Sequence, residues 1–365
     1  MTSTRTATPP SSRLTANALT TGRLPRYAPW ALFGGSLAVF AIIFAMVTMA
    51  NGGTFNIVAA VFFGVVLFDV LLFVVTYLVE GGRQARDRLV TSLVLTAFLV
   101  ALLPLISLLF TVIVNGVGRF DVQFFSESMR NVVGAGGGAL HAIVGTLLIT
   151  GMATLISVPV GLLSAIYLVE YGRGPLARSI TFFVDVMTGI PSIVAGLFAF
   201  ALFSLVTDDP GIRFGVGGAV ALSLLMIPVV VRSSEEMLRI VPNELREASY
   251  ALGVPKWLTI LKIVIPTSLA GITTGVTLAI ARVIGETAPL LIIAGFTTSM
   301  NYDLFGGRMM TLPVFVYNQY AYPGTDVAAY TERAWAGALA LILIVMALNL
   351  IARLIARTFS PKLGR

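Results

Sequence analysis

The stretch EASYALGVPKWLTILKIVIP, residues 247–266, is a polar interruption in a very apolar chain. It contains two short helical patterns joined by Gly253 and Pro255, with long apolar stretches on both sides. Gly253 is placed to end the first helix in a left-handed conformation, and Pro255 to begin the second. The pattern predicts a short amphipathic helix-turn-helix in water, of the kind that docks into a groove of another protein.

The neighbouring apolar stretches belong to a series of eight, each able to cross about 30 Å of hydrocarbon as a helix. They are 31–50, 54–79, 89–114, 139–169, 179–206, 214–231, 267–296 and 334–352. The sequence therefore predicts an all-α transmembrane fold, a polytopic helical bundle of about eight spans. The segment before them, 1–28, is rich in Thr, Ser, Pro and Arg, and is predicted to be a disordered basic tail.

The composition agrees with a membrane protein, because 57% of the 365 residues are hydrophobic and only 11% are charged. A soluble chain carries about 25% charged residues. There is no cysteine and one histidine, so thiol chemistry and a multi-His metal site are excluded, and no metal or cofactor is expected. The chain has no P-loop to bind ATP, and almost no catalytic constellation for an intramembrane enzyme.

The net charge of +7 indicates membrane topology rather than nucleic acid binding, because the basic residues lie between the apolar stretches. With the N-terminus in the cytoplasm, eighteen of the 24 Lys and Arg residues fall on the cytoplasmic side and five outside. Both termini and the 247–266 segment are therefore predicted to be cytoplasmic. Two outer connections are long, 115–138 and 297–333; each is either a loop over the bundle or a surface for an external partner.

The polar segment resembles the EAA loop of ABC importer permeases, in which Glu and Ala are followed by Gly and then by an Ile-x-x-Pro ending. The positions that match are Glu247, Ala248, Gly253, Ile263 and Pro266. Ser249 and Ile265 depart from the family pattern, which usually has Ala and Leu there. The resemblance implies that the loop couples the permease to a separate ATPase subunit, and that the segment is in water because its partner is.

Further stretches resemble the PstA-type permeases of bacterial high-affinity phosphate ABC importers. They include AIYLVEYGRG (165–174), TGIPSIVAGLFAF (188–200) and above all IARVIGETAPLL (280–291). The resemblance covers residues 89–365 and implies a permease domain with its coupling loop at 232–266. Residues 29–88 then form two additional N-terminal spans outside the six-span pattern.

The resemblance also implies the assembly and the task. The partners would be a PstC-type second permease, a PstB-type ATPase dimer and an external PstS-type phosphate-binding protein, in the bacterial inner membrane. This chain would be the phosphate permease and not itself the ATPase. A permease for another oxyanion, such as sulfate or molybdate, and a phosphate-sensing membrane subunit remain alternatives.

Charges inside the seventh span need a reason, because a mid-membrane charge costs at least about 2.5–3.5 kcal/mol. Arg282 and Glu286 are four residues apart, on one face of a helix that Pro289 is expected to break. A guanidinium suits phosphate, so one hypothesis places this pair on the translocation path. The alternative is a structural ion pair packed against the second permease.

Two further pairs of residues complete the candidate site. Arg232 and Glu235, at the cytoplasmic end of the sixth span, are either plain interface anchors or a gate that closes the inner mouth. Thr188 and Ser192 flank a predicted kink in the fifth span, where hydroxyls and freed amides could line the path.

Overall fold

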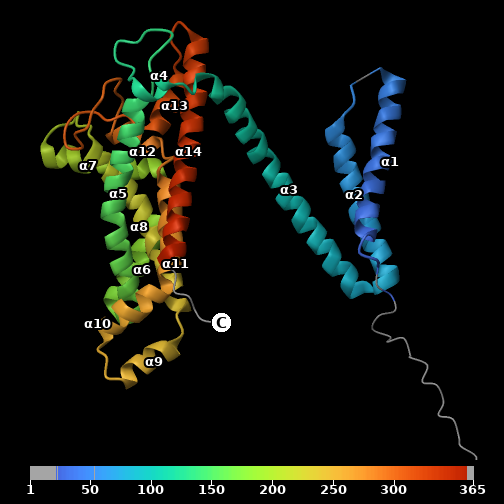
Figure 1. The fold of residues 1–365 in the computed structure, drawn as a ribbon, viewed down its shortest axis with the longest axis horizontal. Helices are drawn as coiled ribbons and strands as arrows, with labels where there is room; N and C mark the ends of the chain where they lie inside the picture. Colours follow the sequence, from blue (N-terminus) through green and yellow to red (C-terminus); the bar gives the residue numbers. More distant parts are fainter. Residues whose placement is uncertain (1–21, 23, 53, 360–365) are drawn as a thin grey trace, which may run out of the picture. The chain divides into compact units, whose positions relative to one another are not determined.

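The computed structural model describes residues 22, 24–52 and 54–359, so most of the predicted tail, 1–28, lies outside the described residues. Within those ranges the chain is helical and has no β-strand (Figure 1). Its helices are α1 (Ala28–Asn51), α2 (Ile57–Glu80), α3 (Gly82–Gly116), α4 (Val122–Ser126), α5 (Leu140–Ile166), α6 (Pro175–Thr188), α7 (Ser192–Thr207), α8 (Gly215–Ile240), α9 (Asn243–Ala251), α10 (Lys256–Thr259), α11 (Ile265–Val283), α12 (Ala288–Ile293), α13 (Leu312–Ala321) and α14 (Val327–Phe359). One 3₁₀ turn, η1 (Val117–Arg119), and two π-helical turns, η2 (Tyr167–Tyr171) and η3 (Ile260–Val264), lie between them.

Seven of the described helices are long and apolar enough to cross a membrane. An eighth crossing results if α6 and α7, which correspond to the predicted fifth span, are taken together. The chain bends by 112° at the short break between these two helices, so the expected kink is a break into two separate helices that point in different directions. The sixth predicted span, 214–231, is too short, because α8 keeps its helical hydrogen bonds through a charged turn to Ile240. The first residues of the predicted loop 232–266 are therefore helical.

The chain divides into two compact units, 1–108 and 109–365. In the first unit α1 packs against α2, and Asp69 in the middle of α2 accepts a hydrogen bond from Ser92 of α3. A hydrogen-bond partner lowers the cost of this carboxylate in hydrocarbon. The domain boundary predicted at residue 89 stays a prediction, because the border between the compact units falls within α3.

The second unit is built around α8, whose main neighbours are α5 and α11. In its most apolar stretch 67% of the residues are buried, a larger share than in any other candidate span. Small residues bring the backbones of α5 and α8 close together, as is usual between membrane helices. Gly161 of α5 lies against Val230, and Gly218 of α8 lies against Ile149. The site described below is anchored on this central helix.

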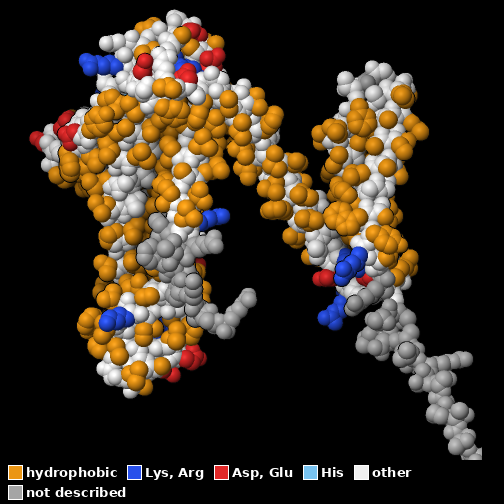
Figure 2. All heavy atoms as spheres, in the orientation of Figure 1, with side chains coloured by type: hydrophobic (Ala, Val, Ile, Leu, Met, Phe, Trp, Pro, Cys, Tyr) orange, Lys and Arg blue, Asp and Glu red, His pale blue; other side chains and the backbone are white. Residues whose placement is uncertain are grey.

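The surface of the second unit has apolar flanks and charged ends. In Figure 2 hydrophobic side chains cover most of its flanks, while charged side chains gather mainly at its two ends. We call these ends the α9 end, which carries α9 and α10, and the α13 end, which carries α4 and α13 (Figure 1). The apolar flanks and polar ends are those of a multi-pass membrane protein.

The polar segment at the α9 end differs in one respect from the predicted helix-turn-helix. α9 is a separate helix, but α10, η3 and α11 run without interruption from Lys256 to Val283. The second half of the pattern is therefore the start of a membrane helix. Pro266 does not break it, because it lies in the first turn of α11, directly after the π-helical turn, where the missing N–H is tolerated.

Candidate functional site

A cluster of ion pairs joins α6 to the last turns of α8. Arg232 donates from Nη1 to Oε2 of Glu235 at 3.0 Å and from Nη2 to Asp185 of α6. Arg239 donates to the other oxygen of Glu235. The side chain of Glu235 is only 8% exposed, against 60% for Asp185, so Glu235 is the buried centre of the cluster. The predicted pair of Arg232 and Glu235 is present, and the sequence did not reveal that Asp185 is the second partner of Arg232.

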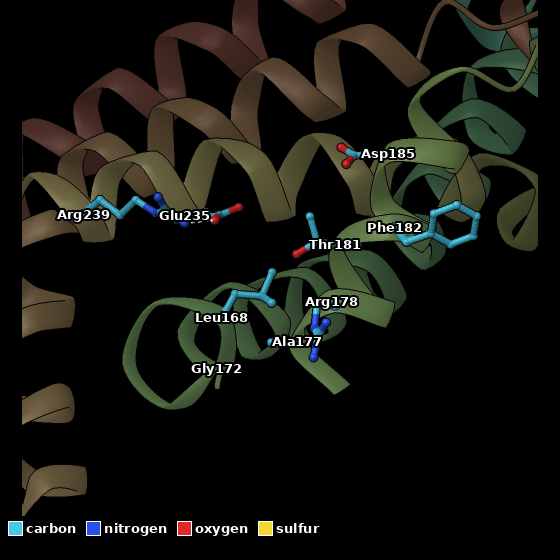
Figure 3. A pocket seen from close by; sticks show the side chains of 9 residues that line it. All are labelled: Leu168, Gly172, Ala177, Arg178, Thr181, Phe182, Asp185, Glu235 and Arg239. Atoms are coloured by element: carbon cyan, nitrogen blue, oxygen red, sulfur yellow. Dashed lines mark hydrogen bonds and ion pairs between the residues drawn. The ribbon is translucent and has the colours of Figure 1, made fainter. Parts of the chain in front are cut away.

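A cavity of about 400 Å³ lies beside this cluster, between α6, α8 and the end of α5. Figure 3 shows Glu235 and Arg239 on α8 and Thr181 and Asp185 on α6. The lining residues are Leu168, Gly172, Ala177, Arg178, Thr181, Phe182, Asp185, Glu235 and Arg239. Both guanidinium and carboxylate groups border the cavity. An unpaired carboxylate would repel an anion, so the cavity can receive one only while its carboxylates are paired with arginine.

The end of α9 has the cap that the sequence predicts. Gly253 has φ +79°, its N–H donates to the carbonyl of Tyr250 at 2.9 Å, and the N–H of Val254 donates to Ser249 at 3.2 Å. These two bonds form a Schellman motif, which satisfies the last carbonyls of the helix. The chain then turns sharply into α10, so the cap fixes the direction of α9.

The five residues of the EAA pattern fall into two groups. Glu247, Ala248 and Gly253 are exposed on α9 and its cap, while Ile263 and Pro266 are half-buried where the chain enters the bundle. Large apolar side chains accompany the exposed group, among them Leu252, 83% exposed, and Trp257, 61% exposed. An apolar surface of this kind on a polar segment is typical of an interaction site.

The departure of Ser249 from the family pattern has a structural reason. Its hydroxyl lies 2.8 Å from that of Thr259, and both residues are buried. This hydrogen bond connects α9 directly to α10. A serine is therefore accommodated where alanine is usual, because its buried hydroxyl has a partner.

Arg246 ties α9 to two membrane helices, and sequence reasoning missed it. Its Nε and Nη2 both donate to Oε1 of Glu170, in the π-helical turn after α5, at 3.0 and 2.9 Å. The same guanidinium donates to the carbonyls of Leu238 and Val241 at the end of α8. The side chains of Arg246 and Glu170 are 12% and 5% exposed. The available signal was Glu170 within AIYLVEYGRG, but the two partners are 76 residues apart.

The mid-membrane pair is not arranged as expected. α11 ends at Val283, so Glu286 lies in the break before α12 and does not share a helix face with Arg282. That prediction is wrong, because Gly285 and Pro289 end the helix before Glu286 is reached. Among the ion pairs of the described residues none joins Arg282 to Glu286. The predicted break itself is confirmed, and the role of both residues on the path stays a prediction.

Thr188 and Ser192 lie on either side of the break between α6 and α7. Thr188 is the last residue of α6, and its hydroxyl donates to the carbonyl of Val184 at 2.8 Å. Ser192 is the first residue of α7 and is half-buried. The expected break is confirmed, whereas freed backbone amides and a path-lining role of the two hydroxyls stay predictions.

Arg333, near the start of α14, is a second residue that sequence reasoning missed. It is completely buried and donates to Gln319 at 2.9 Å and to the carbonyls of Gly134 and Gly136 at 2.7 and 3.0 Å. It thereby fixes the glycine-rich run 134–138 over the α13 end. Within the described ranges, no three His, Cys, Asp or Glu residues are grouped so that they could hold a metal ion.

Comparison with known proteins identifies the relatives of this chain. Residues 157–365 match the family described as binding-protein-dependent transport system inner membrane component. The chain is 48% identical over 278 residues to phosphate transport system permease protein PstA 1 of Mycobacterium tuberculosis, covering 75% of this chain and 89% of the relative. It is 40% identical over 273 residues to PstA of Pasteurella multocida, covering 74% and 95%.

Among solved structures, a bacterial alginate ABC transporter shares the fold. It was crystallised in complex with an alginate pentasaccharide-bound periplasmic protein. The match has a TM-score of 0.55 at 14% sequence identity and covers 77% of this chain and 97% of the other.

Proposed function

Because this chain belongs to the PstA family of phosphate transport system permease proteins, we propose that it is the membrane subunit through which an ATP-driven importer moves inorganic phosphate into a bacterial cell. The observation that carries the proposal is α9, a capped helix with exposed Glu247 and Ala248 at one end of an apolar bundle. A chain without a P-loop needs an external source of energy, and α9 offers the surface to receive it.

The partners follow from the family and from the two polar ends of the second unit. A PstB-type ATPase dimer docks on α9, a PstC-type permease completes the path within the membrane, and a PstS-type protein delivers phosphate at the α13 end. This chain hydrolyses no ATP itself. The α9 end faces the cytoplasm and the membrane is the inner one, as the distribution of Lys and Arg supports.

The domain division accompanies this proposal. Residues 89–365 are the permease domain and carry the coupling segment 232–266, while 29–88 add two spans and 1–28 a basic tail.

The ion pairs at the α9 end form an inner gate. Arg232 is oriented by Glu235 of its own helix, α8, and joins α8 to α6 through Asp185, so α6 is held in place while this ion pair persists. Motion of α9 reaches α5 and α8 through Arg246, which touches both. When that motion separates α6 from α8, the Arg232 guanidinium is freed and can pair with a passing phosphate. Glu235 keeps a counter-charge in Arg239 throughout.

Within the membrane the path passes the two helix breaks. Arg282 provides a fork of donors for phosphate, and the nearby Glu286 disfavours a trapped dianion by repulsion, so that phosphate is released. Thr188 and Ser192 add hydroxyl donors at the break of α6 and α7. These four residues would line the path without any cofactor or metal.

The test of the proposed function is radiolabelled phosphate uptake at low external phosphate, with sulfate and molybdate uptake as controls. Deleting the gene should abolish phosphate uptake only, and the intact gene should restore it. Loss of sulfate or molybdate uptake instead would identify another oxyanion as the cargo. Unchanged phosphate uptake in a strain with no second phosphate importer would refute phosphate as the cargo and leave an ABC permease of another cargo or a sensing subunit.

Docking on α9 has its own matched pair of variants. Glu247→Lys should prevent co-purification of the ATPase, because it reverses a charge on the proposed docking surface. Glu244→Lys changes an exposed glutamate of the same helix outside the EAA pattern, and the ATPase should remain bound. Arg282→Gln should abolish uptake in a fully assembled complex; loss of assembly would instead favour a structural role for Arg282.

A further inference from the structure

A second polar cavity lies at the α13 end, away from the ion pairs of α8. Its volume is about 350 Å³, and it is formed by the connection between α7 and α8 and by the segment after α12. The lining residues are Asp209, Gly211, Ile212, Arg213, Phe214, Phe305, Gly307 and Arg308. Two arginines against one carboxylate give this cavity a net positive charge.

The two arginines are brought together over a single glycine. Gly295 has φ +80°, and a Cβ at that position would lie 2.8 Å from Cδ of Arg213 and 3.3 Å from Cγ of Arg308. The aliphatic parts of both side chains therefore approach the same point, and both arginines line the same cavity. No ion pair to either arginine is found among the described residues. An anion in the cavity would be attracted by both positive charges.

Arg213 is held in place with most of its donors free. Its Nε donates to the carbonyl of Ile292 in α12 at 3.1 Å, and its guanidinium carbon lies 5.9 Å from the centre of the Phe200 ring. Neither Nη nitrogen has a hydrogen-bond partner within the described part of the chain. The one carboxylate of the cavity, Asp209, accepts from the N–H of Gly211 at 2.8 Å. The guanidinium is thus oriented through Nε, and its two Nη nitrogens remain free to donate to a ligand.

The walls of the cavity are fixed by backbone hydrogen bonds. The N–H of Phe214 donates to Ile293 at 3.0 Å, that of Val216 to Leu304 at 2.8 Å, and that of Met309 to Ala294 at 3.0 Å. These bonds tie both wall segments to each other through the end of α12 and the start of α8. A site built on fixed walls loses little entropy when a ligand binds.

We propose that Arg213 and Arg308 form a binding site for the phosphate dianion, where phosphate first meets this subunit before entering the bundle. The inference rests on the proposed function, since it places the site at the end where phosphate is delivered. Two guanidinium forks together offer more donors than one oxygen pair can accept, and the hydrogen phosphate dianion has three unprotonated oxygens to accept from them. A lipid headgroup offers similar chemistry, but its phosphodiester has only two non-bridging oxygens.

The experiment measures equilibrium binding of radiolabelled inorganic phosphate to the purified, nucleotide-free importer complex in detergent, without the external binding protein. Arg213→Gln and Arg308→Gln should each weaken binding at least about tenfold, because each removes hydrogen bonds from a charged group. Arg130→Gln is the matched control: Arg130 is another exposed arginine at the α13 end, outside the cavity, and its loss should leave binding unchanged. Arg213→Lys should give an intermediate affinity, because it keeps the charge and loses the fork.

Each outcome decides the proposal. Wild-type affinity in assembled Arg213→Gln and Arg308→Gln complexes overturns it, even where cells still take up phosphate and the proposed function stands. Displacement of phosphate by an equal concentration of short-chain phosphatidylglycerol, lost in the same variants, also overturns it and makes the site one for lipid. Should a glutamine variant fail to assemble, Arg213→Lys decides alone, since unchanged affinity there refutes recognition by the fork. Failure of the wild-type complex to transport phosphate would refute the proposed function instead.

Discussion

The ion pair between Arg246 and Glu170 should dominate the stability of the α9 end. We consider Arg246→Met, Glu170→Met and the double variant. Removing the arginine leaves the Glu170 carboxylate, 5% exposed, without a partner, and breaking a buried pair in this way costs about 3–5 kcal/mol. Removing the glutamate leaves the arginine its hydrogen bonds to Leu238, Val241 and Asn243. The free energy of unfolding should therefore fall less, by about 1.5–3 kcal/mol, which is typical of one hydrogen bond to a charged group.

The double variant tests whether these costs arise from one interaction. With both charges gone no buried charge is left unpaired, so its destabilisation should be smaller than the sum of the single ones by about 2 kcal/mol or more. The assay is SDS-induced unfolding of the purified chain in mixed micelles, followed by far-UV circular dichroism. As a control, Arg246→Met combined with Glu247→Gln should be additive, because Glu247 is not among the hydrogen-bond or ion-pair partners of Arg246. Additivity within about 0.5 kcal/mol for the pair with Glu170 would refute the reasoning.

Three further variants test other parts of the structure. Arg232→Gln should uncouple ATP hydrolysis from uptake, because α6 loses its bonds to α8; phosphate-independent ATPase activity should rise while radiolabelled uptake falls, and wild-type values of both would contradict the gate. Gly253→Ala should lower the unfolding free energy by about 1–2 kcal/mol, because a left-handed residue acquires a Cβ, whereas the same change at Gly118, which has negative φ and open space around it, should have a small effect. Arg333→Met should release the glycine run 134–138 and make it sensitive to limited proteolysis from the α13 side; an unchanged digestion pattern would show that the loop is held by other contacts.

The sequence was most informative where one local rule acts on neighbouring residues. Apolar stretches of sufficient length predicted the spans, and the left-handed requirement after α9 predicted Gly253 as its cap. The pairing of Arg232 with Glu235 also follows from local spacing, three residues apart on a helix. In each case the partners are near in the chain, so helix geometry alone brings them together.

Features that depend on distant parts of the chain could not be predicted in the same way. Gly189 and Pro191 indicate that the fifth span breaks, but its angle of 112° depends on how α7 packs against α12 and α8. Mean hydropathy depends on composition and carries no information on the direction of the helix axis, so the apolar stretch 179–206 was predicted as one span although it contains parts of two helices. Arg246 with Glu170 and Arg213 with Arg308 meet only after folding, and no periodicity connects them.

The uninterrupted helix from Lys256 to Val283 has a mechanical consequence. At 1.5 Å per residue its 28 residues form a rod about 42 Å long. One end adjoins the α9 cap, and the other carries Arg282 one residue before the helix stops. Because the helix is continuous, a tilt at its first residues displaces its last residues, and no loop lies between them to absorb the motion. The π-helical turn Ile260–Val264, followed closely by Pro266, is where this helix departs from α-helical geometry, so any bending between its two ends should concentrate there.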